Sequence, residues 1–188
     1  MPAHFDLTIR IPLPSRLPAS AVIEALQSQS PMIRHQPLIT RYERVPVALD
    51  SVVADSWFLE IGSKISSYRI YEKVTVVPGV FKTEISFPAV LQSIPGGLRS
   101  RAEAPGGVRV WSEWIVVPRP EERWPGERTK GGKLGAYVEG DYDLVETTRL
   151  QTSRMLMPLV KGQMESAHRD LCAKVLDEVA QKIGRAKV

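Results

Sequence analysis

MLMPLVKGQMESAHRDLCAKVLDEVAQKI, residues 155–183, is the stretch that decides how the rest of this chain must fold. A set of mostly apolar residues recurs every three or four positions, at Val160, Met164, His168, Leu171, Val175 and Val179. This spacing places them along one stripe of an α-helix. A helix of about 25 residues would be roughly 38 Å long. The stretch therefore predicts a long amphipathic helix that needs a broad apolar surface to lie on.

The chain before this helix is rich in alternating apolar and polar residues, which is the pattern of half-buried strands. The strands predicted in this way include residues 5–11, 57–61, 68–77, 108–117 and 135–146. Two short helices are expected after the first strand, and a loop at 50–56. Pro–Gly turns join most of the later strands. Hairpin-linked strands of this kind indicate an antiparallel meander.

We expect an α+β fold in which a curved antiparallel β-sheet of six to seven strands wraps around the long C-terminal helix. The 188 residues suit one domain, 1–188, with a flexible loop at 118–133. Such a sheet must cover one apolar face, and the helix is the obvious cover. A strongly bent sheet around one helix often leaves a cavity between the two.

The composition of the chain argues against several classes of function. No apolar run approaches the ~20 residues that span a membrane, and no signal peptide is recognisable, so we expect a cytoplasmic protein. The formal charge is +4, but Lys and Arg alternate with Asp and Glu, which argues against nucleic acid. The single Cys172 and three scattered histidines predict no metal site. No phosphate-binding loop or nucleophile elbow occurs, so we expect no cofactor.

Several short motifs resemble a fungal domain family of unknown function. They are LTIRIPLP near the N-terminus, PLITRY at Pro37, WFLEI at Trp57, the Pro-Gly-Gly-Leu turn, YVEGDYDL at Tyr137 and the Val160–His168 segment. The element order is similar to the helix-grip fold of the START-like (SRPBCC) superfamily. That superfamily includes plant allergens, lipid-transfer domains and polyketide aromatase/cyclases. The resemblance implies a cavity for a hydrophobic ligand; it does not imply catalysis.

Glu72 is the first candidate for chemistry. Strand parity puts it on the same face as its apolar neighbours Ile70 and Val74. A carboxyl group buried there would have a raised pKa, which suits general acid/base work. The alternative is a structural glutamate that pairs with an Arg or Tyr.

The same parity gives further inward-facing residues. Trp114 offers a flat apolar wall and Ser112 a hydrogen-bonding point. Tyr42 and Tyr142 are phenols that could act beside Glu72. The remaining residues expected to line a ligand site are Tyr68, Phe81, Thr83, Phe87 and Glu146. Ordinary core packing explains each of them as well.

His168 lies in the middle of the apolar stripe of the helix, between Met164 and Leu171, so it should face the sheet. It is either a satisfied core residue or a proton donor or acceptor for a ligand. Lys161 lies about two turns earlier and could reach the cavity rim. Met164 offers adaptable apolar lining.

Two functions remain open, beside the less specific option of a scaffold or interaction domain whose cavity is filled by side chains. The first is a cofactor-free cyclase, isomerase or dehydratase that acts on a hydrophobic polyketide- or terpenoid-like intermediate, with Glu72, His168, Tyr142 and Tyr42 as acid/base groups. The second is a non-catalytic carrier of a lipid, sterol or other hydrophobic small molecule. The deciding feature is whether Glu72 and His168 meet at one cavity. A strand edge near Trp57 could also support a homodimer.

Overall fold

The computed structural model describes residues 2–58, 64–77, 81–119 and 142–186. Seven strands form the sheet: β1 (Pro2–Pro12), β2 (Ile39–Val45), β3 (Ile65–Val77), β4 (Phe81–Ile94), β5 (Gly97–Ala104), β6 (Val108–Pro118) and β7 (Tyr142–Ser153). The helices are α1 (Ala19–Gln27), α2 (Ser30–Arg34), α3 (Leu49–Val53) and α4 (Met157–Ala186).

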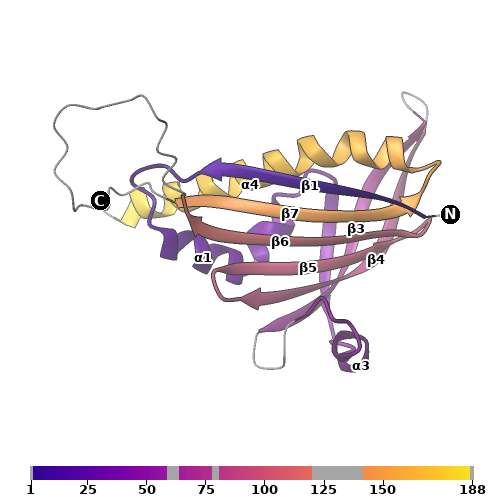
Figure 1. Ribbon diagram of the computed structural model, residues 1–188, viewed down its shortest axis with the longest axis horizontal. Helices are drawn as coiled ribbons and strands as arrows, with labels where there is room; N and C mark the ends of the chain where they lie inside the picture. The colour runs from indigo at the N-terminus through magenta and orange to yellow at the C-terminus, as the bar shows by residue number, and fades with distance from the viewer. Residues whose placement is uncertain (1, 59–63, 78–80, 120–141, 187–188) are drawn as a thin grey trace, which may run out of the picture.

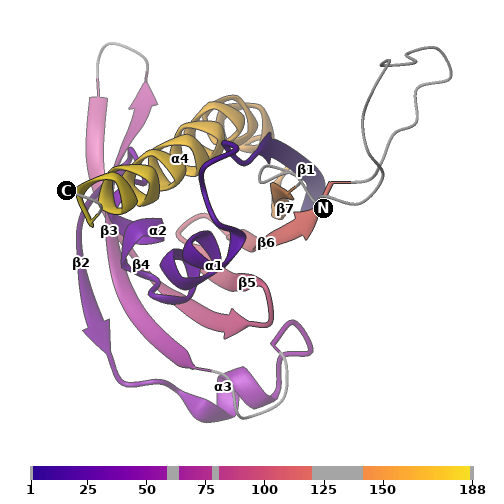
Figure 2. The same cartoon turned by 90° about the vertical axis from the view of Figure 1, so that its left-hand side faces the viewer.

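The strands lie in the order β1-β7-β6-β5-β4-β3-β2, and every neighbouring pair is antiparallel. Strands β2 to β7 are therefore a meander, and β1 joins at the edge beside β7. The sheet is strongly curved, and α1, α2 and α4 lie within its concave side (Figures 1 and 2). The predicted α+β architecture, a curved antiparallel sheet around a long C-terminal helix, is confirmed.

Helix α4 has two differently packed halves. Its C-terminal half presents Leu171, Val175 and Val179, which are all buried, to the interior. Helix α1 fills the same end of the fold with Val22 and Leu26, each 0% exposed. The N-terminal half of α4 lies at the other end of the sheet, away from α1 (Figure 1).

The strand predicted at residues 57–61 is wrong for the part that the structure describes. Trp57 and Phe58 lie in a turn after α3, whereas we expected the α3 segment to be a loop. Phe58 packs with Val52 of α3 and with Val90 on the convex face of the sheet. Trp57 and Phe58 thus cover the outer face of the sheet from a turn, beside α3.

The predicted last strand also differs. Strand β7 runs from Tyr142 to Ser153, past the predicted end at residue 146, and α4 follows at Met157. Threonines at positions 147, 148 and 152 keep this segment extended, since β-branched residues favour strands. Pro118, placed at the start of the predicted flexible loop, instead ends β6. Residues 120–133 of that loop lie outside the described residues.

Gly97, which begins β5, packs unusually close to the next strand. A Cβ atom added there would lie 1.8 Å from the carbonyl oxygen of Trp114 on β6. The preceding Gly96 has a φ of +79°, a conformation that favours glycine. Both glycines are needed for the tight β4–β5 turn.

None of the helices that the structure describes is long and apolar enough to cross a lipid bilayer.

Candidate functional site

A cavity of about 410 Å³ lies between the sheet and the N-terminal half of α4. Strands β2 to β6 supply its curved wall, and α2 supplies Met32, Ile33 and the nearby Gln36. Helix α4 supplies Leu159, Val160, Met164, Ala167 and His168. The volume lies within the range of small-molecule sites in proteins.

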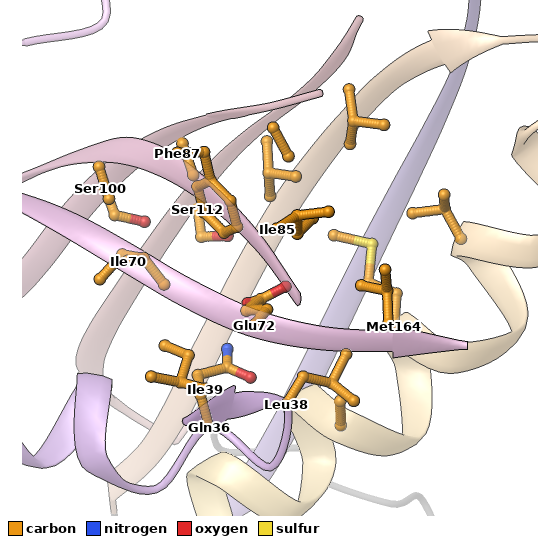
Figure 3. Close-up of a pocket in the computed structure, with 18 of the residues that line it drawn as sticks. Gln36, Leu38, Ile39, Ile70, Glu72, Ile85, Phe87, Ser100, Ser112 and Met164 are labelled. Carbon is orange, nitrogen blue, oxygen red and sulfur yellow. The ribbon is translucent and has the colours of Figure 1, made fainter. Parts of the chain in front are cut away.

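The wall of this cavity is almost entirely apolar. Aliphatic and aromatic side chains such as Ile70, Ile85 and Phe87 surround it (Figure 3). Among the described lining residues, only Glu72 and His168 are titratable, and there is no Lys or Arg. The cavity therefore suits an uncharged, hydrophobic molecule, and it offers that molecule two groups able to move a proton.

Glu72 comes from the middle of β3 and has apolar neighbours on both sides. Its cross-strand partners are Ile39 on β2 and Ile85 on β4. Its carboxyl group points into the cavity (Figure 3), and no described residue forms a hydrogen bond with it. Burial raises the pKa of Glu72 to about 7, although a positive charge on His168 acts in the opposite direction. At neutral pH this carboxyl group is therefore present in both its acid and its base form.

His168 comes from α4 and is held on two sides. Its Nδ1 contacts Oε1 of Glu146 on β7, and its ring stacks on Trp114 with a centroid distance of 6.5 Å and an interplanar angle of 14°. The histidine is 8% exposed. The carboxyl group fixes the ring's orientation and uses Nδ1, so Nε2 is the nitrogen left for a ligand.

Glu146 is fully buried behind His168, at 0% exposure, and does not itself line the cavity. The Thr148 hydroxyl donates to its Oε1 at 2.9 Å, and the Cys172 thiol donates to its Oε2 at 3.3 Å. Burial, and then the Glu146 carboxylate, raise the pKa of Cys172, so the thiol keeps its proton. A carboxylate that accepts from three donors is well suited to hold an imidazole in place.

A second hydroxyl extends this network back to the cavity. Oγ of Ser112 on β6 lies 2.8 Å from Oγ1 of Thr148 on β7, and the two residues are direct cross-strand partners. Ser112 lines the cavity, whereas Thr148 does not. The chain Ser112–Thr148–Glu146–His168 therefore begins and ends at the cavity wall.

Glu72 and His168 can act on one bound molecule from two walls of the cavity. Glu72 on β3 is the nearer of the two to solvent, and His168 on α4 is set in a buried network. One group can take a proton while the other gives one. This is the arrangement on which the choice between catalyst and carrier depends.

Five of the other sequence-predicted residues also lie on the cavity wall. They are Thr83, Phe87, Ser112, Trp114 and Met164. The side chain of Phe81 lies outside the described residues.

Five predicted residues do not line the cavity. Tyr68 is buried beside it, where its hydroxyl donates to Gln29 Oε1 at 3.1 Å, and Tyr42 packs edge-on against Tyr68. Tyr142 starts β7 at the far end of the sheet and is 38% exposed. Lys161 points out of the fold, with its Nζ 4.6 Å from the centroid of Phe5 on β1. Glu146, as described above, lies behind His168.

Sequence reasoning missed α2 as a cavity wall, and it missed Thr148 and Cys172. Thr148 lies two residues after Glu146 on the same face of β7, and Cys172 lies one helical turn after His168. Both spacings are visible in the sequence. Without the register of β6 against β7, nothing indicated that these residues meet.

Among the residues that the structure describes, no group of three or more His, Cys, Asp or Glu side chains is arranged to hold a metal ion.

Solved structures with a similar fold share little sequence identity with this chain. The Zhui aromatase/cyclase from Streptomyces shares 15% identity with a TM-score of 0.58, covering 97% of this chain and 96% of its own. TTHA0849 from Thermus thermophilus also shares 15% identity, with a TM-score of 0.55 over 96% of this chain and 99% of its own.

A norcoclaurine synthase point mutant from Thalictrum flavum, in complex with a transition state analogue, shares 10% identity. Its TM-score is 0.53 over 97% of this chain and 98% of its own. These likenesses show that the chain shares the fold of these proteins, a curved antiparallel sheet around a long C-terminal helix. The comparison with curated proteins gives no match.

The family is established separately, by a match over residues 2–181 to a domain of unknown function. This match includes the strands, the cavity wall and most of α4. The chain belongs to the DUF7053 family.

Proposed function

We propose that this protein is an enzyme that acts without a cofactor, by general acid/base catalysis, on an uncharged polyketide- or terpenoid-like intermediate. The single observation that carries the proposal is that Glu72 and His168 face one apolar cavity. A carboxyl group without a partner in such a wall lowers stability and gives nothing to packing. Its presence there is explained if a ligand uses it.

The reaction class follows from the two groups. The Glu72 carboxylate takes a proton from a carbon next to a ligand carbonyl, and the C–H electron pair becomes a carbon–carbon double bond. The carbonyl oxygen receives a proton from Nε2 of protonated His168, so an enol forms. In an isomerisation, Glu72 returns its proton to another carbon, and the enol O–H proton goes back to His168. In a cyclisation, the enol carbon attacks a second carbonyl carbon, the enol O–H proton goes back to His168, and the new alkoxide oxygen takes the proton held by Glu72. Each step conserves protons between ligand and protein.

The pKa of Glu72 favours this role. A general acid/base works best when its pKa lies near the working pH, and burial puts the pKa of Glu72 at about 7. The cyclase activity named for the Streptomyces relative is consistent with this class of chemistry. A place in a fungal biosynthetic pathway, as the motif resemblance suggested, belongs to the same proposal.

The test is proton exchange at carbon. Purified protein is incubated with 2-tetralone in D₂O at pH 7, and loss of the α-proton signal is followed by NMR. We expect the protein to accelerate exchange, and Glu72→Gln to slow the protein-dependent rate by about 10²–10⁴-fold. Glu84→Gln is the matched control, because Glu84 lies on the neighbouring strand with its side chain exposed. Equal rates in wild type and Glu72→Gln would refute the proposal.

The second candidate is a carrier of a hydrophobic molecule, which the apolar wall favours. Mass spectrometry of ligand extracted from the purified protein identifies what the cavity takes. A carrier retains its ligand unchanged, and the retained amount is the same in wild type and Glu72→Gln. An enzyme converts the ligand, and the conversion stops in the variant.

A further inference from the structure

The buried hydroxyl pair of Ser112 and Thr148 has a fixed direction of hydrogen bonding. Each hydroxyl group has one hydrogen to donate. The Thr148 hydrogen is used in the bond to Glu146 Oε1, at 2.9 Å. The hydrogen in the 2.8 Å contact between Ser112 and Thr148 must therefore come from Ser112.

Glu146 sets this direction because it acts as an acceptor. Three donors, from His168, Thr148 and Cys172, meet at its two oxygens. An ionised carboxyl group accepts from all three, whereas a protonated one would direct its own hydrogen at one of them. The fully buried carboxylate thus orients Thr148, and Thr148 orients Ser112.

The consequence lies at the cavity wall. Ser112 is 1% exposed and lines the cavity, and its only hydrogen points away from the ligand space. It therefore offers the ligand lone pairs alone. A carbonyl or ether oxygen placed there would meet another oxygen with no hydrogen between them, which leaves both groups unsatisfied. The other wall hydroxyls, Thr83 and Ser100, belong to no such chain among the described residues.

From this geometry we infer that Ser112 is a specificity-determining residue, which selects ligands that present a hydrogen-bond donor, a hydroxyl or N–H group, at its position. Together with the apolar wall, this narrows the ligand class to uncharged hydrophobic molecules that carry a hydroxyl or N–H group. The inference deepens the proposed function and rests on it only in assuming that the same cavity takes an apolar ligand. It does not require that the ligand is converted.

The test compares three naphthalenes that differ in one substituent: 2-naphthol, a donor, and 2-methoxynaphthalene and 2-acetylnaphthalene, which are acceptors only. Dissociation constants are measured by fluorescence titration. We expect wild type to bind 2-naphthol about tenfold more tightly than the ether. Ser112→Ala removes the lone pairs, so we expect the ratio to fall to about one.

Thr148→Val gives the sharper result. It removes the acceptor for the Ser112 hydrogen and frees that hydrogen to point into the cavity. We expect 2-acetylnaphthalene to gain about five- to tenfold in affinity in this variant. The matched control is Thr152→Val, on the same face of β7, whose buried hydroxyl has no hydrogen-bond partner among the described residues. We expect this control to leave all three affinities unchanged.

Three results would overturn the inference: a wild-type ratio near one, a ratio that survives in Ser112→Ala, or no binding of any of the three probes. A surviving ratio would mean that Glu72, not Ser112, receives the donor. Failure of the enzyme proposal can be distinguished from failure of this inference. If the protein causes no proton exchange but its preference for 2-naphthol is lost in Ser112→Ala, this inference stands and catalysis is rejected.

Discussion

The two halves of α4 lie against the same sheet but meet different interiors. The C-terminal half, with Leu171, Val175 and Val179, packs against α1 and the sheet in one buried cluster. The N-terminal half, with Val160 and Met164, faces the cavity. The difference arises from α1, which occupies one end of the concave side only (Figure 1). A single amphipathic stripe can therefore serve as core at one end and as a cavity wall at the other.

Two carboxyl groups, one near each half of α4, show the same contrast. Glu178, near the C-terminal end, has three partners: Lys182 at 2.6 Å, Arg34 at 2.9 Å and His35 at 2.6 Å. Glu72, at the cavity, has none among the described residues. The first carboxylate fastens α2 to α4, and the second is left available. The charge of Glu178 is balanced in the half of α4 that packs as core, and among the described residues Glu72 has no such partner at the cavity.

The largest difference between the halves is expected from truncating one apolar residue in each. Leu171→Ala leaves a void in a filled region, and we expect it to lower the free energy of unfolding by about 3 kcal/mol. Ile85→Ala only enlarges an existing cavity, and we expect a loss of about 1 kcal/mol. Urea denaturation measures both. Similar losses would mean that the cavity half is as tightly packed as the other.

Glu72→Gln is expected to change the free energy of unfolding by a smaller amount and to raise it instead of lowering it. The pKa of Glu72 is about 7 in the fold and 4.5 when unfolded, so the unfolded chain releases this proton first as pH rises. Wild-type stability should therefore fall between pH 4.5 and 7. A tenfold change in an ionisation constant corresponds to about 1.4 kcal/mol, and solvent reaches part of this half-buried side chain. At pH 8 we therefore expect the variant to be about 2 kcal/mol more stable than wild type.

Urea denaturation at pH 4 and pH 8 tests this prediction, with Glu84→Gln as the control carboxyl group. At pH 4 the Glu72 side chain is mostly protonated in both folded and unfolded chains, so the variant and wild type should be nearly equal in stability. A variant less stable than wild type at pH 8 would show that Glu72 has a structural partner.

The smallest change in the free energy of unfolding is expected from substituting Glu178. The hydrogen bond from Lys182, with those from His35 and Arg34, lowers the pKa of Glu178 to about 2. Its stabilising contribution is therefore present above pH 4.5 and is lost as pH falls toward 2. Because Arg34 and Lys182 are largely exposed, we expect Glu178→Gln to lose only about 1 kcal/mol at pH 7. Denaturation at pH 2 should show little difference, and a constant difference at both pH values would contradict the mechanism.

The sequence was sufficient for the fold because its two periodicities are strong. The three-to-four spacing from Val160 to Val179 and the two-residue alternation in β3 and β6 each predict one face without tertiary information. The same parity placed Glu72, Ser112 and Trp114 on the inward face, and all three line the cavity. It failed at Trp57, where an apolar run packs on the convex face from a turn instead of from a strand.

The polar network could not be predicted, because its members come from separate elements. Glu146 meets His168 and Cys172 only through the position of α4 over β7, and Ser112 meets Thr148 only through the register of β6. Periodicity fixes which face a residue is on, and it does not fix what lies opposite. For the same reason Tyr142 shares the parity of Leu144 yet lies beyond the end of the cavity.

Gly97 links the β4–β5 turn to the imidazole of His168. The backbone of Trp114 occupies the space that a side chain at position 97 would need, and the indole ring of Trp114 lies flat on His168. Even an alanine at this turn would push the sixth strand outward and tilt the indole away from the helix. The position of the indole beside His168 thus depends on the absence of a single methyl group at position 97.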